Sequence, residues 1–222
     1  MLGLEEIIGL EVISSDARVV GTVEGVGVDL LQWKVPALSV GLRRGVEDLA
    51  GIKKRPFSVE KVYMRTQDLE AISDTVIMKL PLSSVGETIY QEQETVTPAG
   101  SLMGMRVILR NARYIGMVDN MLFDPAGDWS IPYLQVKPDR STVEELNMSR
   151  SFMTSPLVPV RTADIRAIGD MVMMGIDMGE LKESLRNRGA PSGGPPPPPP
   201  GPPQEERWEP PEQYRDQYRQ GP

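Results

Sequence analysis

The chain contains one sequence pattern twice, and this repetition limits the folds that are available to it. Residues 9–23 read Gly-Leu-Glu-Val-Ile-Ser-Ser-Asp-Ala-Arg-Val-Val-Gly-Thr-Val, and residues 104–118 read Gly-Met-Arg-Val-Ile-Leu-Arg-Asn-Ala-Arg-Tyr-Ile-Gly-Met-Val. The offset between them is 95 residues (104 − 9). Residues 68–78 recur at 164–174 with an offset of 96 (164 − 68), so one residue is inserted between the blocks. Two blocks in the same order indicate two copies of one small domain.

The repetition also predicts where the domains begin and end. We expect a first repeat at 1–90, a linker at 91–101, a second repeat at 102–189 and a tail at 190–222. Each repeat is close to the smallest size at which a domain folds alone, which favours packing of the two repeats against each other with pseudo-two-fold symmetry. An unbroken run of prolines and a polar remainder predict a tail that forms polyproline II and is disordered by itself.

Short β-branched segments separated by turn residues predict a mainly β fold in each repeat. Gly21 and Gly116 interrupt equivalent strands, where glycine usually marks a bulge or a bend, and a small barrel needs such bends. Each repeat should close with one strand that ends at Met78 or Met174. Short helices are expected at Val46–Leu49, Leu82–Tyr90, Thr142–Leu146 (capped by Ser141 or Thr142) and Met178–Arg188 (begun by Asp177).

Composition excludes several classes of function. The chain has no cysteine and no histidine, which removes disulfides, the usual zinc sites and Ser-His-Asp chemistry. Its net charge of −7 lacks the basic footprint of a nucleic-acid-binding protein, so RNA is not expected as the main partner. We see no apolar run long enough to cross a membrane and no signal peptide, and the absence of cysteine fits a cytoplasmic protein.

The doubled pattern resembles the PRC-barrel superfamily, which is named for the photosynthetic reaction centre. The resemblance lies in the opening segments 15–23 and 110–118, which end in Gly-Thr-Val and Gly-Met-Val, and in the closing segments 71–76 and 167–172. The first repeat departs from the family at Ser73, where glycine is usual, and the second departs at Met117. The resemblance implies two small antiparallel β-barrels in tandem, with short helices and no catalytic residues.

The same resemblance implies a function class. The combination of tandem barrels and a proline-rich tail is most similar to a stand-alone archaeal group whose members include cell-division proteins that bind the SepF anchor of the FtsZ ring. A non-enzymatic interaction adaptor without a cofactor is therefore expected. Its partner would be a SepF-like division anchor, another PRC-barrel protein or further copies of the chain. The alternative is an RNA-processing or ribosome-assembly factor of the RimM type.

Two groups of residues are candidates for partner binding. The basic residues Lys53, Lys54 and Arg55 lie near Arg43 and Arg44 and would suit a phosphate or an anionic surface, although a solvated loop explains them as well. In the tail, Trp208, Tyr214 and Tyr218 would suit a tethered binding motif, since the two tyrosines are one helical turn apart. A disordered tail with incidental aromatic residues is the alternative.

Three further features have a structural explanation and a functional one. Met171 and Met173 should share one face of a strand and Val172 and Met174 the other, which indicates either an interface or ordinary core filling. The equivalent pair Asp74 and Asp170 is expected to form turns or bulges rather than a catalytic site. Arg18 and Arg113, also equivalent, are expected on solvated hairpin arms rather than in an anion site.

Overall fold

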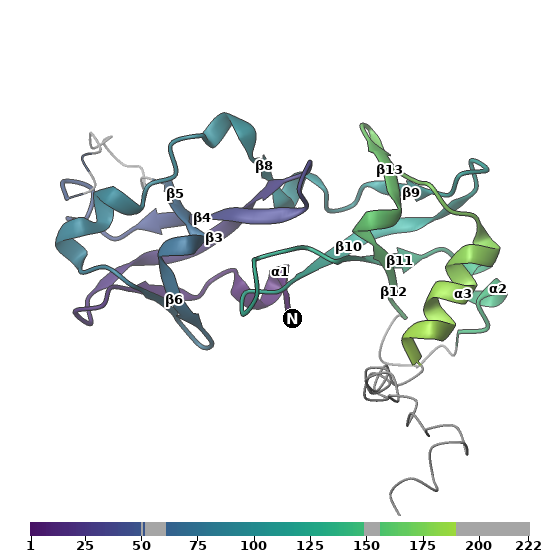
Figure 1. Cartoon of the computed structure of the whole chain (residues 1–222), viewed down its shortest axis with the longest axis horizontal. Helices are drawn as coiled ribbons and strands as arrows, with labels where there is room; N and C mark the ends of the chain where they lie inside the picture. Colours follow the sequence, from purple (N-terminus) through teal and green to yellow (C-terminus); the bar gives the residue numbers. More distant parts are fainter. Residues whose placement is uncertain (50, 52–60, 149–155, 190–222) are drawn as a thin grey trace, which may run out of the picture. The chain divides into compact units, whose positions relative to one another are not determined.

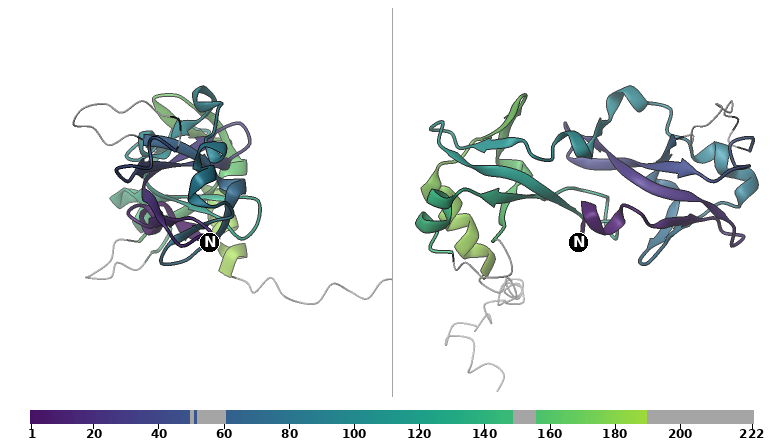
Figure 2. Two further views of the ribbon diagram at one scale, coloured as in Figure 1. Left: turned by 90° about the vertical axis from the view of Figure 1, so that its left-hand side faces the viewer. Right: turned by 180° about the vertical axis from the view of Figure 1, so that it is seen from behind.

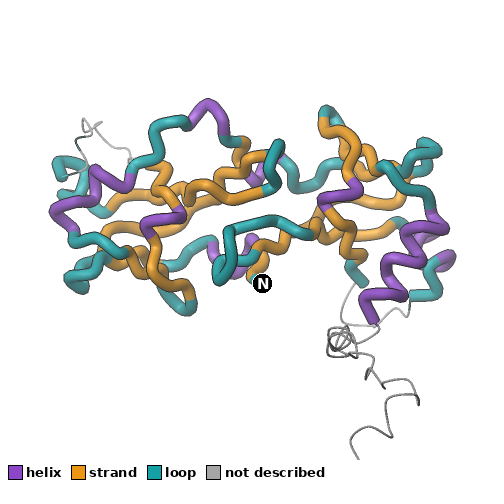
Figure 3. Tube along the Cα trace, viewed as in Figure 1, coloured by secondary structure: helices purple, strands orange, loops and turns teal. Residues whose placement is uncertain are grey.

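Each repeat folds into one mixed sheet of short strands, as Figures 1 and 3 show. The computed structural model describes residues 1–49, 51, 61–148 and 156–189. The first sheet has the order β5-β4-β3-β2-β7-β6 with β8 beside β3, and the second has the order β12-β11-β10-β9-β14-β13 with β1 beside β10. The two orders are the same, so the sequence repeat is also a repeat of topology.

The strands of the first sheet are β2 (Glu11–Ile13), β3 (Val19–Asp29), β4 (Lys34–Leu42), β5 (Lys61–Arg65), β6 (Leu69–Ile72), β7 (Val76–Met78) and β8 (Thr97–Pro98). Those of the second are β1 (Leu2–Gly3), β9 (Arg106–Ile108), β10 (Tyr114–Phe123), β11 (Tyr133–Pro138), β12 (Val158–Arg161), β13 (Ile165–Ile168) and β14 (Met171–Met174). The helices are α1 (Leu4–Ile7), α2 (Arg140–Glu145) and α3 (Met178–Gly189). Short 3-10 helices are η1 (Thr66–Asp68), η2 (Leu82–Thr88), η3 (Gln93–Thr95), η4 (Ala99–Ser101) and η5 (Thr162–Asp164).

The mainly β class is confirmed, with differences in detail. Each sheet is antiparallel except for one parallel pair, β2 with β7 and β9 with β14. Neither sheet is closed into a complete hydrogen-bonded barrel among the described residues. The expected single closing strand is wrong, because the segment folds back on itself as the hairpins β6–β7 and β13–β14. Asp74 and Asp170 lie in the tight bends of these hairpins, as turn chemistry predicts.

Three of the four expected helices form. Met178–Arg188 is helical, and Asp177 begins it by accepting a hydrogen bond from the Glu180 N–H at 3.0 Å. The cap of α2 is Asp139, which accepts from the Thr142 N–H, so the expected cap at Ser141 or Thr142 is wrong. Residues 82–88 form a 3-10 helix. Val46–Leu49 forms turns, because Gly45 has a positive φ and hydrogen bonds reach only three residues back.

The mid-strand glycines are required where two backbones approach closely. A Cβ on Gly116 would overlap the carbonyl oxygen of Lys137 in β11, and Gly116 has a φ of +147°. A Cβ on Gly21 would overlap the carbonyl oxygen of Gly41 in β4. The strand register shifts beside both positions, between Val12 and Ile13 and between Tyr114 and Gly116. The predicted bulge or bend at these glycines is therefore confirmed.

The repeats exchange strands in a reciprocal way. Leu2 of β1 pairs with Phe123 of β10, and Thr97 of β8 pairs with Val28 of β3 at the same offset of 95 residues. Figure 2 shows α1 next to the end of β10, where the Asn120 side chain accepts a hydrogen bond from the Leu4 N–H at 2.9 Å. Residues 97–101, which the sequence places in the linker, thus form β8 and η4.

A second reciprocal contact joins the turns between long strands. The Val35 N–H donates to the Trp129 carbonyl at 2.9 Å, and the Ile131 N–H donates to the Trp33 carbonyl at 2.7 Å. Lys34 faces Ser130, its own counterpart at offset 96. One hydrophobic cluster contains buried side chains of both repeats, and Met1–Leu185 form one compact unit.

Candidate functional site

The site residues expected from the sequence are not placed by the structure. Lys53, Lys54 and Arg55 lie outside the described residues, and so do Trp208, Tyr214 and Tyr218. Of the basic group, only Arg43 and Arg44 are described, and both are exposed. The prediction that these residues bind a partner stays a prediction, as does the disorder of the tail.

The described part of the chain contains no group of three or more acidic side chains that could hold a metal ion. None of its helices is long and apolar enough to span a membrane. Its sheets carry two outer surfaces that differ between the repeats.

Arg113 belongs to an ion-pair network that joins α2, α3 and the β9–β10 hairpin. Glu145 pairs with Lys182 at 3.2 Å and with Arg113, and both cations lower the pKa of Glu145. In the first repeat, Arg18 is exposed and lies 3.6 Å from Asp16. These partners support the expectation of solvated, structural arginines rather than an anion site.

The outer side of the second sheet carries a patch that we call the methionine face, formed by Arg106, Ile108, Tyr114, Met117, Met171 and Met173. Strand pairing places Met171, Arg106 and Met117 in one row and Met173, Ile108 and Tyr114 in the next. Residues paired in register point to the same side of a sheet. Met117 is 45% exposed, and Ile108, Tyr114, Met171 and Met173 are half-buried. Met171 and Met173 are thus surface residues rather than core filling.

Arg106 is held at the centre of this face by an aromatic neighbour. Its guanidinium carbon lies 5.2 Å from the centre of the Tyr114 ring, a cation–π distance. In the same repeat, Arg110, Arg113, Arg140 and Arg161 each pair with a carboxylate. Arg106 has no such partner within the described ranges, and neither does its in-register neighbour across Met117, Lys137. The face therefore combines apolar area with uncompensated positive charge.

The first repeat has a hollow that overlaps the equivalent surface on β2 and β3 and extends over β4 rather than β7. It has a volume of about 530 Å³ and is lined by Glu11, Val19, Gly21, Thr22, Glu24, Gly41, Leu42 and Arg43. At the matching positions, Glu11 replaces Arg106, Val19 replaces Tyr114 and Thr22 replaces Met117. The central charge is thus inverted and the bulky side chains are lost. We call this surface the glycine hollow.

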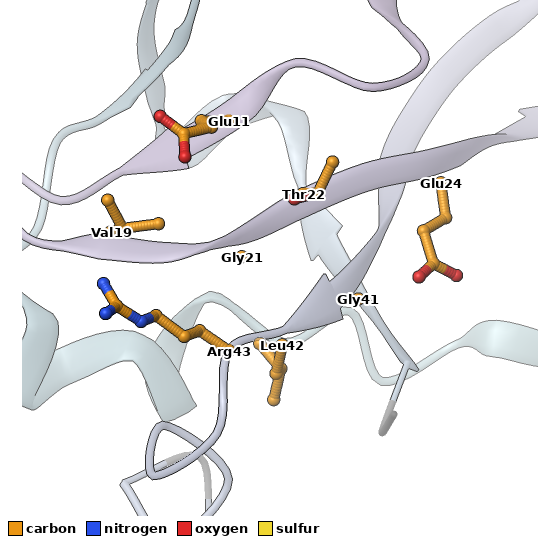
Figure 4. Close-up of a pocket in the computed structure, with 8 residues that line it drawn as sticks. All are labelled: Glu11, Val19, Gly21, Thr22, Glu24, Gly41, Leu42 and Arg43. Atoms are coloured by element: carbon orange, nitrogen blue, oxygen red, sulfur yellow. The ribbon is translucent and has the colours of Figure 1, made fainter. Parts of the chain in front are cut away.

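The floor of the hollow is bare backbone. Figure 4 shows Gly21 and Gly41 between Arg43 at one end and Glu24 at the other. A Cβ on Gly41 would overlap the Glu24 carboxylate, which is held there by an ion pair with Lys61 at 2.6 Å. Glu11 and Arg43 have no ion-pair partner among the residues described. The hollow is therefore open, polar and charged at its rim.

Comparison with known proteins gives little further guidance. No protein-family model matches the chain, and no curated protein matches it. The chain is similar to the crystal structure of a putative 16S ribosomal RNA processing protein, RimM, from Pseudomonas aeruginosa, at 15% identity. The similarity covers 71% of this chain and 98% of that one with a TM-score of 0.25, which is too low to support an inference.

Proposed function

We propose that this chain is a non-enzymatic protein-interaction adaptor whose partners bind the outer faces of its two sheets. The observation that carries the proposal is the divergence of two equivalent surfaces on one repeated scaffold. Bends, bulges and buried positions are shared by the repeats, whereas the methionine face and the glycine hollow differ in charge and bulk. Exposed positions are free of the packing constraints that keep the buried positions alike, so the two surfaces can take different partners without a change of fold.

The methionine face has the chemistry of a protein-binding surface. Methionine side chains are flexible and polarisable, so they adapt to irregular partners, while Tyr and Arg are enriched at the centres of interfaces. Three methionines, an isoleucine, a tyrosine and an arginine lie at paired positions on one side of β14, β9 and β10. Such a surface gains affinity by burying apolar area and specificity from the single cation.

Within this class, we propose archaeal cell division in the cytoplasm as the process and a SepF-like anchor of the FtsZ ring as the first partner to test. Support for this finer proposal comes from the resemblance of the doubled sequence pattern to the PRC-barrel group. The features of the described surface that would support the ribosome-assembly alternative are the basic residues Arg43, Arg44, Arg106 and Lys137, with Tyr114 beside Arg106. The net charge of −7 weighs against it.

Capture from an extract of the native cell, with the full chain as bait, tests the proposal. Met117→Asp places a charge on the methionine face, and Leu31→Asp is the matched control, because Leu31 is a 97% exposed apolar residue in the turn between β3 and β4 of the first repeat. We expect division proteins to be recovered by the unmodified chain and by Leu31→Asp and to be lost with Met117→Asp. Ribosomal proteins in their place would support the alternative, and equal recovery by all three baits would contradict the proposal.

A further inference from the structure

We infer that the methionine face of one molecule packs into the glycine hollow of a second copy of this chain. The inference rests on the proposed function, since it identifies one partner of the surfaces described above. It depends on two properties of those surfaces, their shape and their charge.

The two surfaces are complementary in bulk. The hollow is open because Gly21, Gly41 and Thr22 leave about 530 Å³ between the strands. The methionine face presents Met117 and Tyr114 at the matching positions of the other repeat. An unbranched methionine can adjust its rotamer to fill such a space. Met117 and Tyr114 of one molecule can therefore fit into the hollow of another copy.

The charges are also complementary. The methionine face carries Arg106, and exposed Asp119 lies beside it in the bulge of β10, two residues beyond Met117; the hollow carries Glu11 together with Arg43. None of these four side chains has an ion-pair partner among the described residues. If Arg106 of one molecule pairs with Glu11 of the other, Asp119 and Arg43 form a second pair of opposite charges across the contact. Contact between two methionine faces would instead bring two arginines together, which costs association energy.

The contact would be heterologous, because it joins different surfaces of identical chains. A heterologous contact leaves one free face and one free hollow on every pair, so further copies can add until a ring closes or an open chain forms. Duplication followed by divergence of the outer faces would thus give a single chain two different ends.

Sedimentation velocity of the full chain over a range of concentrations tests this contact by charge exchange. Arg106→Glu and Glu11→Arg each place like charges across the contact and should weaken association by about tenfold or more, equivalent to about 1.4 kcal/mol. In an equimolar mixture of the two variants, opposite charges meet again at every contact, so association should return. Arg140→Glu and Glu94→Arg are matched controls at exposed sites outside both surfaces and should associate like the unmodified chain.

Three results would overturn the inference: a chain that stays monomeric at all concentrations, single variants that still associate, or a mixture that does not recover. Association that is lost on replacing Trp208, Tyr214 and Tyr218 by alanine but kept in Arg106→Glu would assign the contact to the tail instead. A monomeric chain that still captures an extract protein through Met117 would refute self-association and leave the proposed function standing.

Discussion

Replacement of Gly116 by alanine tests the close approach of β10 and β11, on which the methionine face depends. The added Cβ would overlap the Lys137 carbonyl oxygen and lie 2.8 Å from the Pro138 Cα, and the backbone φ is +147°. Backbone strain at such a φ costs about 1–3 kcal/mol for a residue with a side chain. If the added Cβ forces β10 and β11 apart, one or two hydrogen bonds between them break, at about 0.5–1.5 kcal/mol each. We therefore expect a loss of about 2–5 kcal/mol, and at least as much for the bulkier Gly116→Val.

Two further glycines separate the causes of this loss. Gly21→Ala creates the same kind of overlap, with the Gly41 carbonyl oxygen, but its φ lies outside the strained range. Its loss of unfolding free energy should therefore be smaller than that of Gly116→Ala by the backbone strain alone. Gly25→Ala in the same strand is the control, because its Cβ would meet only the Ser39 Cβ at 3.6 Å. The second repeat already carries Asn120 at that position. The Gly25 variant should change stability by about 0.5 kcal/mol or less.

Urea unfolding monitored by circular dichroism measures all three variants against the unmodified chain. The expected order of midpoints is Gly25→Ala highest, then Gly21→Ala, then Gly116→Ala, with the slope unchanged. If Gly116→Ala unfolds at the same urea concentration as Gly25→Ala, the bend is not required at that site, and the account of the methionine face given above is wrong.

Three more predictions concern the contacts between repeats and the tail. Lys34 hydrogen-bonds Asp128 at 2.8 Å and lowers the pKa of that carboxyl from 3.8 to about 2. The stability that this pair contributes is present above pH 3.8 and is lost as the pH falls toward 2. An NMR titration should therefore show a higher Asp128 pKa in Lys34→Gln. Fragments 1–97 and 98–222 should each unfold at lower urea than the intact chain, because the cut divides β8 and separates β1 from β10, and equal midpoints would show that the repeats are independent. Truncation after Gly189 should reduce recovery of extract partners if the tail aromatics bind, whereas unchanged yield would assign binding to the sheets.

The strand pattern and its interruptions could be predicted because they are local. Alternating β-branched residues define β3 and β10, and a glycine inside each predicts the bend at Gly21 and Gly116. In the segment of β6 and β7, apolar residues continue on both sides of Ser73 and Asp74, so the pattern predicts one strand where the structure has a hairpin. The exchanged strands β1 and β8 are two residues long, which is too short for any periodicity. They form strands because each pairs with a strand that is far away in sequence.

The candidate surfaces were partly visible in the sequence. Alternation placed Met171 and Met173 on one face, but no local pattern shows whether that face looks into the core or out of it, since β14 is apolar on both sides. Their neighbours on this face are Arg106, Ile108, Tyr114 and Met117, which precede Met171 by more than fifty residues. Comparison of the repeats at fixed offset does give a signal, because Glu11 and Arg106 differ in charge at one shared position.

The two repeats separate the requirements of folding from those of binding. Facing the core, equivalent positions hold equivalent side chains, such as Val12 with Val107 and Met78 with Met174, all fully buried. One residue earlier in each strand, the side chains that face outward differ: Glu11 corresponds to Arg106, and Ile77 corresponds to Met173. Because side chains alternate between the faces of a strand, an outward substitution changes what the surface binds while the buried set stays intact. Only the bends at Gly21 and Gly116 serve both purposes, since they hold the strands together and shape the surface, so substitutions there should impair stability and binding at once.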